Sequence, residues 1–137
     1  MSASVTGRCH CGRVTYESTK PVNWSCFCHC EDCRRSTGAV AAAFVGFDRT
    51  AFEWTSAKPA VYPSSEGVRR LFCGDCGTPL AFDADRYGEE IHLYTGTLDH
   101  PENTPATFSV YAEEKIPWVH LGDGLKAYAK SGSGEEY

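Results

Sequence analysis

The segment from Cys26 to Cys33 reads CFCHCEDC and holds four of the eight cysteines in this 137-residue chain. The other four stand in two pairs, within Cys9–Gly12 (CHCG) and Cys73–Gly77 (CGDCG). Sulfur ligands lie about 2.3 Å from a zinc ion, so cysteines separated by one or two residues can hold one metal on a tight turn. Three such clusters favour a zinc protein over disulfides, free structural thiols or an iron–sulfur cluster with ferredoxin spacing.

The cysteines divide by spacing into two ligand sets, so two zinc ions per chain are predicted. The two distant pairs complete a four-thiolate site of the structural type. Its members are Cys9, Cys11, Cys73 and Cys76. The local triplet leaves a fourth position open, as catalytic and binding zinc sites do. Its members are Cys28, Cys30 and Cys33. Gly74 and Gly77 are expected to supply the positive φ that the second pair needs.

Other ligands remain as alternatives for the triplet site. Cys26 precedes Cys28 by two residues, shares its face in an extended chain, and could close the site as a fourth ligand. His10 and His29 each stand between two cysteines and point to the opposite face, so we expect them to pack or to support the ligands. A second site closed by a fourth protein ligand would make the protein a non-catalytic zinc-binding module. A three-thiolate site that releases its metal on oxidation would make it a zinc or redox sensor.

Residues beside the triplet are candidates for contact with a substrate. Arg34 and Arg35 follow it directly and could hold a carboxylate by a bidentate contact, the alternative being solvated arginines on a helix surface. Asp32 and Asp75 are expected to be turn residues before acid–base groups. Several aromatic residues could wall a pocket, with core packing as the competing role: Trp24, Phe27, Phe44, Trp54 and Phe72.

Bulk composition argues against several classes of partner. The formal net charge is −5 and no basic stripe is present, so a nucleic acid is not expected as partner. No apolar run reaches the roughly 18 residues of a membrane span. The segment Met1–Gly7 lacks the pattern of a secretory signal. We therefore expect a cytoplasmic protein that does not bind membranes, and the oligomeric state stays open.

The chain is expected to form one mainly β domain over residues 1–130, with antiparallel sheets and short helical turns. A Gly/Ser-rich tail at 131–137 is expected to be disordered. The clearest helix signal is Glu31–Thr37, which ends at Gly38. Hydrophobic alternation between prolines predicts short strands at Arg13–Glu17, Trp24–Cys28, Val40–Phe47, Ala51–Thr55, Ala60–Tyr62, Val68–Cys73, Leu80–Phe82, Ile91–Thr95 and Thr107–Tyr111.

Three segments carry a resemblance to a known family: Cys9–Tyr16 (CHCGRVTY), Cys28–Ala39 (CHCEDCRRSTGA) and Arg70–Leu80 (RLFCGDCGTPL). They resemble the glutathione-dependent formaldehyde-activating enzymes, which include the centromere protein V-like proteins, and the likeness extends from Gly7 to Tyr128. It implies a β-tent of stacked antiparallel sheets held by zinc, and the same division of ligands. It also implies a carbon–sulfur lyase that joins formaldehyde and glutathione as S-hydroxymethylglutathione. Ser109, where many relatives have histidine, and the additional Cys26 depart from the family pattern.

The charge of the triplet site indicates its preferred ligand. Zinc with three thiolates carries a net −1 and favours a soft sulfur over hydroxide. A small-molecule thiol such as glutathione, with a pKa near 8.5 when free, would lose its proton on binding there. The sequence therefore predicts a zinc-activated thiol oriented against a carbonyl carbon.

Overall fold

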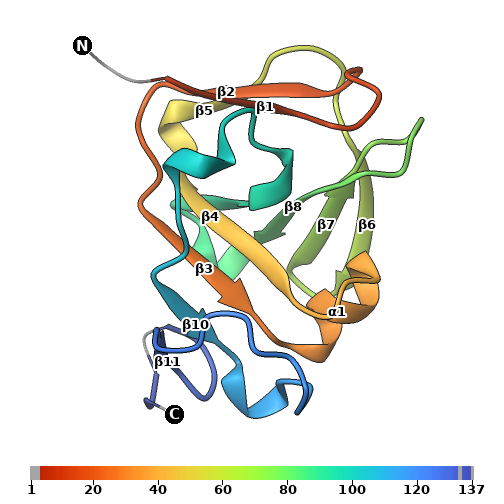
Figure 1. Cartoon of the computed structure of the whole chain (residues 1–137). Helices are drawn as coiled ribbons and strands as arrows, with labels where there is room; N and C mark the ends of the chain where they lie inside the picture. The colour runs from red at the N-terminus through yellow and green to blue at the C-terminus, as the bar shows by residue number, and fades with distance from the viewer. Residues whose placement is uncertain (1–3, 133, 137) are drawn as a thin grey trace.

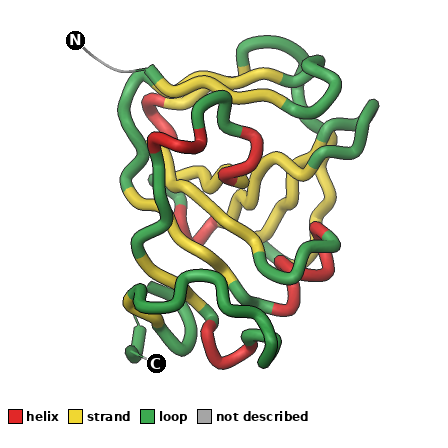
Figure 2. The backbone as a smooth tube through the Cα atoms, in the orientation of Figure 1, coloured by secondary structure: helices red, strands yellow, loops and turns green. Residues whose placement is uncertain are grey.

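Two β-sheets account for most of the secondary structure (Figures 1 and 2). The structure is a computed structural model that describes residues 4–132 and 134–136. The smaller sheet has three strands, in the spatial order β1 (Val5–Arg8), β2 (Thr15–Ser18) and β5 (Phe52–Trp54). The larger sheet has eight strands, in the spatial order β11 (Lys126–Ala127), β10 (Phe108–Val110), β3 (Trp24–Cys28), β4 (Ala42–Asp48), β9 (Glu90–Tyr94), β8 (Pro79–Ala84), β7 (Val68–Phe72) and β6 (Ala60–Ser65).

Helical structure is short. The α-helix α1 (Glu31–Thr37) begins with Cys30 as its N-cap and ends at Gly38, whose φ of 75° lies in the left-handed region. Single-turn 3-10 helices lie at η1 (Arg49–Ala51), η2 (Asp85–Tyr87), η3 (Thr95–Thr97), η4 (Pro101–Asn103) and η5 (Ala112–Glu114). The predicted mainly β fold is confirmed, and both α1 and β3 have the bounds predicted for them.

Most strand pairs are antiparallel, and β10 is the exception. It runs parallel to β3 on one side and to β11 on the other. Residues 95–107 connect β9 to β10 and bring the chain back across the sheet, which is the long crossover that parallel pairing needs. Strand β1 was not predicted, because it is short and contains Gly7. That glycine is required, since a Cβ there would lie 2.3 Å from the Tyr16 ring.

The main core lies between the two sheets. Alternation along β4 sends Val45 and Phe47 into it, and both side chains have no exposed surface. Tyr16 on β2 packs edge-on against Phe47 with ring centroids 6.4 Å apart, and its hydroxyl hydrogen-bonds the Thr97 hydroxyl at 2.7 Å. This core leaves the opposite face of the larger sheet available for a second cluster of side chains.

That second cluster combines cysteines with aromatic rings. Phe44, which precedes Val45 on β4, packs on Tyr94 with a centroid separation of 4.5 Å. Trp24 lies across β4 at Gly46, where a Cβ would come within 2.4 Å of the indole. The period-2 alternation of the strands therefore places Cys26 and Cys28 on the same face as these rings.

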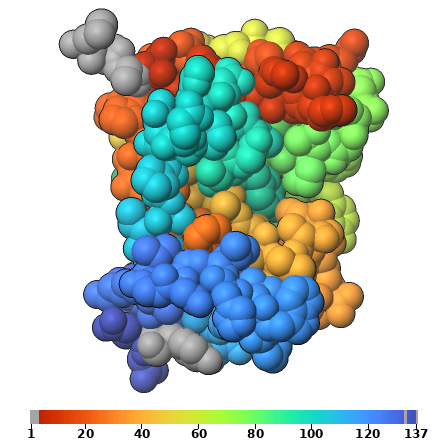
Figure 3. All heavy atoms as spheres, in the orientation of Figure 1, coloured from red at the N-terminus to blue at the C-terminus, as the bar shows by residue number. Residues whose placement is uncertain are grey.

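The first and the last strands of the described chain lie at opposite ends of the molecule. The strands β1 and β2 cover one end, and the C-terminal segment with β10 and β11 covers the other (Figures 1 and 3). Residues 133 and 137 of the predicted disordered tail lie outside the described residues, while Glu136 forms an isolated antiparallel bridge with Tyr128. No helix in the described ranges is long and apolar enough to cross a membrane.

Candidate metal centres and pocket

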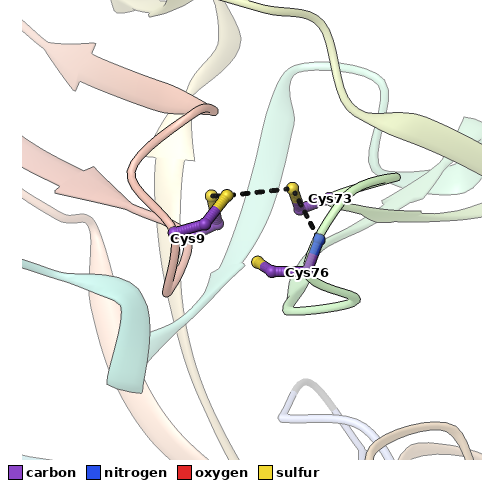
Figure 4. A group of neighbouring side chains, drawn as sticks. Cys9, Cys73 and Cys76 are labelled. Atoms are coloured by element: carbon purple, nitrogen blue, oxygen red, sulfur yellow. Dashed lines mark hydrogen bonds between the residues drawn. The ribbon is translucent and has the colours of Figure 1, made fainter.

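Two groups of cysteine sulfurs could each hold a metal ion. In the first group all sulfur atoms lie within 4.8 Å of one another, and its members are Cys9, Cys11, Cys73 and Cys76. The Sγ atoms of Cys9 and Cys11 are 3.6 Å apart, and those of Cys11 and Cys73 are 3.8 Å apart. Figure 4 shows Cys9, from the loop after β1, facing Cys73 and Cys76 from the loop after β7. The fold thus joins residues that are more than 60 positions apart in the sequence.

The two loops that carry this group have closely similar backbones. The amide of Gly12 donates to the Cys9 carbonyl at 3.1 Å, and that of Gly77 donates to the Cys73 carbonyl at 2.9 Å. The φ angles are 81° at Gly12 and 80° at Gly77, so both turns need the left-handed conformation that glycine adopts readily. The expectation for Gly77 is confirmed. Gly74 does not have a positive φ, and Gly12 supplies it in the other loop instead.

Backbone amides donate hydrogen bonds to the buried sulfurs of this first group. The Val14 amide lies 3.3 Å from Cys9 Sγ, and the amides of Asp75 and Cys76 each lie 3.4 Å from Cys73 Sγ. Four soft sulfur donors around one point match the ligand set of a structural zinc ion. Asp75 also forms a 2.8 Å ion pair with Arg13 across the two loops, but both side chains are largely exposed, so the pair adds little stability.

The second group has three members, Cys28, Cys30 and Cys33, whose sulfur atoms also lie within 4.8 Å of one another. Cys28 ends β3, and α1 begins directly after Cys30, so the strand–helix junction folds the local spacing into a cluster. The Cys33 amide donates to Cys30 Sγ at 3.2 Å, and Cys28 Sγ is 3.7 Å from Cys33 Sγ. Hydrogen bonds from Cys28 and Cys33 lower the pKa of Cys30 to about 3. The contact with Cys30 raises the pKa of Cys28, and Cys30 together with burial raises that of Cys33, so the negative charge that suits a metal cation lies on Cys30.

An arginine distant in sequence contacts this second group. Arg70 on β7 places its Nη1 3.8 Å from Cys33 Sγ and 3.1 Å from both the Ser36 and the Tyr94 hydroxyl oxygens. Its guanidinium carbon also lies 5.1 Å from the centre of the Phe82 ring. Sequence reasoning missed this residue, although it is the first residue of the third family-like segment.

The second group borders a cavity of about 1000 Å³. Of the aromatic candidates, Trp24 and Phe44 line this pocket, whereas Phe27, Trp54 and Phe72 do not. Trp54 instead packs against the core between the sheets. The four cysteines of the first group are not among the lining residues, so only the three-sulfur group has access to the cavity.

The arginine candidates behave differently from each other. Arg35 lines the pocket but forms a 2.7 Å ion pair with Glu31, one helical turn earlier. Arg34 is not a lining residue. Asp32, at the start of α1, also lines the pocket. Ser109 is buried and faces away from the cavity, because Phe108 and Val110 on either side of it line the wall.

The other predicted alternatives lie outside both sulfur groups. His10 is exposed, and His29 is buried with its amide bonded to the Val110 carbonyl at 3.1 Å. Cys26 lines the pocket and is buried, yet it does not belong to either group. Burial raises the pKa of Cys26 to about 12, which keeps it as a neutral thiol.

Replacing Cys26 with alanine is therefore expected to leave the zinc content at two ions per chain. The loss of one buried sulfur should lower the free energy of unfolding by about 1 kcal/mol, as for other small core truncations. Elemental analysis of the purified variant and of the wild-type protein measures the stoichiometry. A loss of one zinc ion would identify Cys26 as the fourth ligand of the second site.

Comparison with known proteins identifies related sequences over most of the chain. The sequence profile of the family described as "Glutathione-dependent formaldehyde-activating enzyme" matches residues 4–114. A curated protein of Halomonas elongata, provisionally named as such an enzyme, is 25% identical over 124 residues, which cover 84% of this chain and 79% of that protein. A crystal structure of a Rhodobacter sphaeroides protein is similar in fold, with a TM-score of 0.58 and 22% identity. The likeness covers 69% of this chain and 87% of that one.

Proposed function

This chain belongs to the glutathione-dependent formaldehyde-activating enzyme family, and we propose that it is a zinc-dependent carbon–sulfur lyase. Its proposed substrate is the adduct of formaldehyde with a small-molecule thiol such as glutathione. The single observation that carries the proposal is that a group of three sulfurs, rather than four, borders the 1000 Å³ cavity. Structural zinc sites have four protein ligands, whereas catalytic sites have three and leave one position for water or substrate. Three sulfurs beside a pocket therefore favour a catalytic site.

The two zinc ions are assigned different roles. The four-sulfur group is proposed to hold a structural ion, and Cys28, Cys30 and Cys33 are proposed to hold the second. Zinc held by these three cysteines would supply a Lewis acid that lowers the pKa of a bound thiol. All eight cysteines are free in the structure, which supports a reducing, cytoplasmic location.

Arg70 is placed to stabilise the charge that develops during the reaction. When a thiolate sulfur bonds to the carbonyl carbon, the π electron pair of the carbonyl moves to its oxygen, which then takes up, by way of solvent, the proton that the thiol released. Arg70 uses Nη1 for its contacts with Cys33, Ser36 and Tyr94. Within the described ranges its Nε and Nη2 have no hydrogen-bond partner, so they can donate to that oxygen. The reverse sequence of bond changes releases formaldehyde and the thiol.

Tyr94 and the aromatic wall support the same chemistry. The hydroxyl of Tyr94 accepts a hydrogen bond from Arg70 at 3.1 Å, which fixes the guanidinium beside the cysteines. Burial raises the pKa of Tyr94, so its hydroxyl stays neutral at pH 7. Phe44 and Phe82 cover the floor of the pocket and reduce the access of water, which strengthens each charge-assisted contact in it.

The proposal is tested by the exchange between free and thiol-bound formaldehyde. With ¹³C-formaldehyde and glutathione at equilibrium, the zinc-loaded protein is expected to accelerate exchange at least ten-fold, as measured by two-dimensional exchange NMR. The same protein stripped of metal by a chelator is the control for uncatalysed adduct formation and for reaction with lysines. A protein with two bound zinc ions and no acceleration would instead be a non-catalytic zinc-binding module.

A further inference from the structure

The pocket extends well beyond the three cysteines. Cys28 and Trp24 lie at opposite ends of β3 and both line the cavity. Four residues of a β-strand span about 13 Å, so the cavity is long enough for a peptide-sized ligand. The strand register places His92 beside Trp24, since each is paired with Gly46 on the intervening strand β4. We call Trp24, Arg86, Tyr87 and His92 the distal end of the pocket; all four line it.

The histidine at the distal end lies against a carboxylate. The Glu90 carboxylate accepts hydrogen bonds from Asn23 Nδ2 at 2.9 Å and from Trp24 Nε1 at 3.2 Å, and it lies 3.1 Å from His92 Nε2. Because the Glu90 oxygens serve as acceptors for Asn23 and Trp24, we assign the ring proton of His92 to Nε2, from which it donates to Glu90 Oε1. The other ring nitrogen, Nδ1, is then an acceptor, and it has no partner among the described residues. Burial lowers the pKa of His92, which keeps the ring neutral.

The arginine at the distal end has no carboxylate partner within residues 4–132 and 134–136. The guanidinium carbon of Arg86 lies 5.0 Å from the centre of the Tyr87 ring and 5.6 Å from that of Phe82. These two rings hold its planar group at the wall while its N–H groups stay available. Arg35, by contrast, already pairs with Glu31. Phe82 also packs against Arg70, so the two arginines flank one ring, with Arg70 on the cysteine side.

We propose that the distal end is a binding subsite for the acidic end of an extended, peptide-like thiol. Arg86 binds a carboxylate by a bidentate contact, and His92 Nδ1 accepts a hydrogen bond from an N–H group of the same ligand. Arg86 is then a specificity-determining residue that favours a peptide thiol over short thiols, whose carboxylates cannot reach it from the cysteines. This inference rests on the proposed function, because it takes the thiol sulfur to lie at the three-cysteine group.

The subsite is tested by binding rather than by turnover. S-methylglutathione carries both carboxylates of glutathione but has no free thiol, so its affinity reports on the pocket. Isothermal titration of the zinc-loaded protein is expected to give a dissociation constant that rises about ten-fold or more in Arg86→Met. Lys58→Met, which removes an exposed cation outside the pocket, is the matched control and should bind like the wild-type protein. S-methyl-N-acetylcysteine, which is too short to reach Arg86, should show no difference between the variants.

The outcomes separate this inference from the proposed function. Equal affinity of wild type and Arg86→Met for S-methylglutathione would overturn the subsite, even if exchange catalysis is observed. Failure of the wild-type protein to bind the ligand at millimolar concentration would overturn it as well. An affinity loss specific to Arg86→Met, together with no acceleration of formaldehyde exchange, would support the subsite and refute the lyase.

Discussion

Cys73→Ser is expected to lose one zinc ion and to lower the free energy of unfolding by more than about 4 kcal/mol, because loss of a structural metal is among the most destabilising single changes. Domains of this kind have a total stability of about 5–15 kcal/mol, so much of the variant should be unfolded at 37 °C. Cys73 has no exposed surface, and its sulfur receives two backbone hydrogen bonds. Water therefore cannot enter beside a serine at this position and replace the missing sulfur ligand. Thermal unfolding by circular dichroism and elemental analysis measure the two effects.

Asp75→Ser provides the matched control in the same loop. Asp75 is exposed, and its replacement removes only the ion pair with Arg13. This loss should lower the free energy of unfolding by less than about 1 kcal/mol. The zinc content of this variant should stay at two ions per chain. If Cys73→Ser melts within a few degrees of Asp75→Ser, the first sulfur group does not hold the fold together.

The second large effect is expected for Cys30→Ser, which should retain its fold, lose one zinc ion and exchange formaldehyde at the uncatalysed rate. The fold should survive because Cys30 is the N-cap of α1, where its sulfur accepts the Cys33 amide, and serine is a strongly preferred residue at that position. Activity should be lost because two thiolates and a hydroxyl bind zinc far more weakly than three thiolates do.

Cys26→Ala is the matched control for this variant, since Cys26 is also a pocket cysteine on the same side of the sheet. It should retain both zinc ions and most of the exchange activity. The Cys30→Ser protein has the same lysines as the wild type. Its assay at equal concentration therefore measures the non-specific reaction of lysines with formaldehyde. If Cys30→Ser is as unstable as Cys73→Ser, the proposed division between a structural and a catalytic ion is wrong.

The cysteine groups could be predicted from the sequence because their members are close together or stand in matching pairs. Chelation needs two sulfurs on one turn, and that requirement is visible as a spacing of one or two residues. The helix after the second group was equally local, with its cap at Cys30 and its end at Gly38. Trp24 could have been separated from Phe27 in advance, since only Trp24 shares the parity of Cys26 and Cys28 along β3.

The remaining pocket residues depend on strand register, which short strands without a diagnostic turn do not reveal. Arg70 reaches Cys33 because β7, β8 and β9 pair in one particular alignment, and no local pattern encodes that alignment. Glu90 and His92 meet Trp24 through β4 for the same reason. The sequence instead suggested Arg34 and Arg35, because they directly follow the cysteines in the chain. Only Arg35 lines the cavity, and its charge is already paired.

The position of the four-sulfur group in the chain has a consequence for biosynthesis. On the ribosome, Cys9 and Cys11 emerge long before Cys73 and Cys76, and strands from both sheets lie between the two pairs. The first pair therefore remains without its two partner sulfurs while the intervening strands are synthesised. With the proposed structural zinc at this site, the newly made chain completes its fold only after the second pair has joined the first around the metal, so the yield of folded protein is expected to follow the intracellular zinc supply at the time of translation.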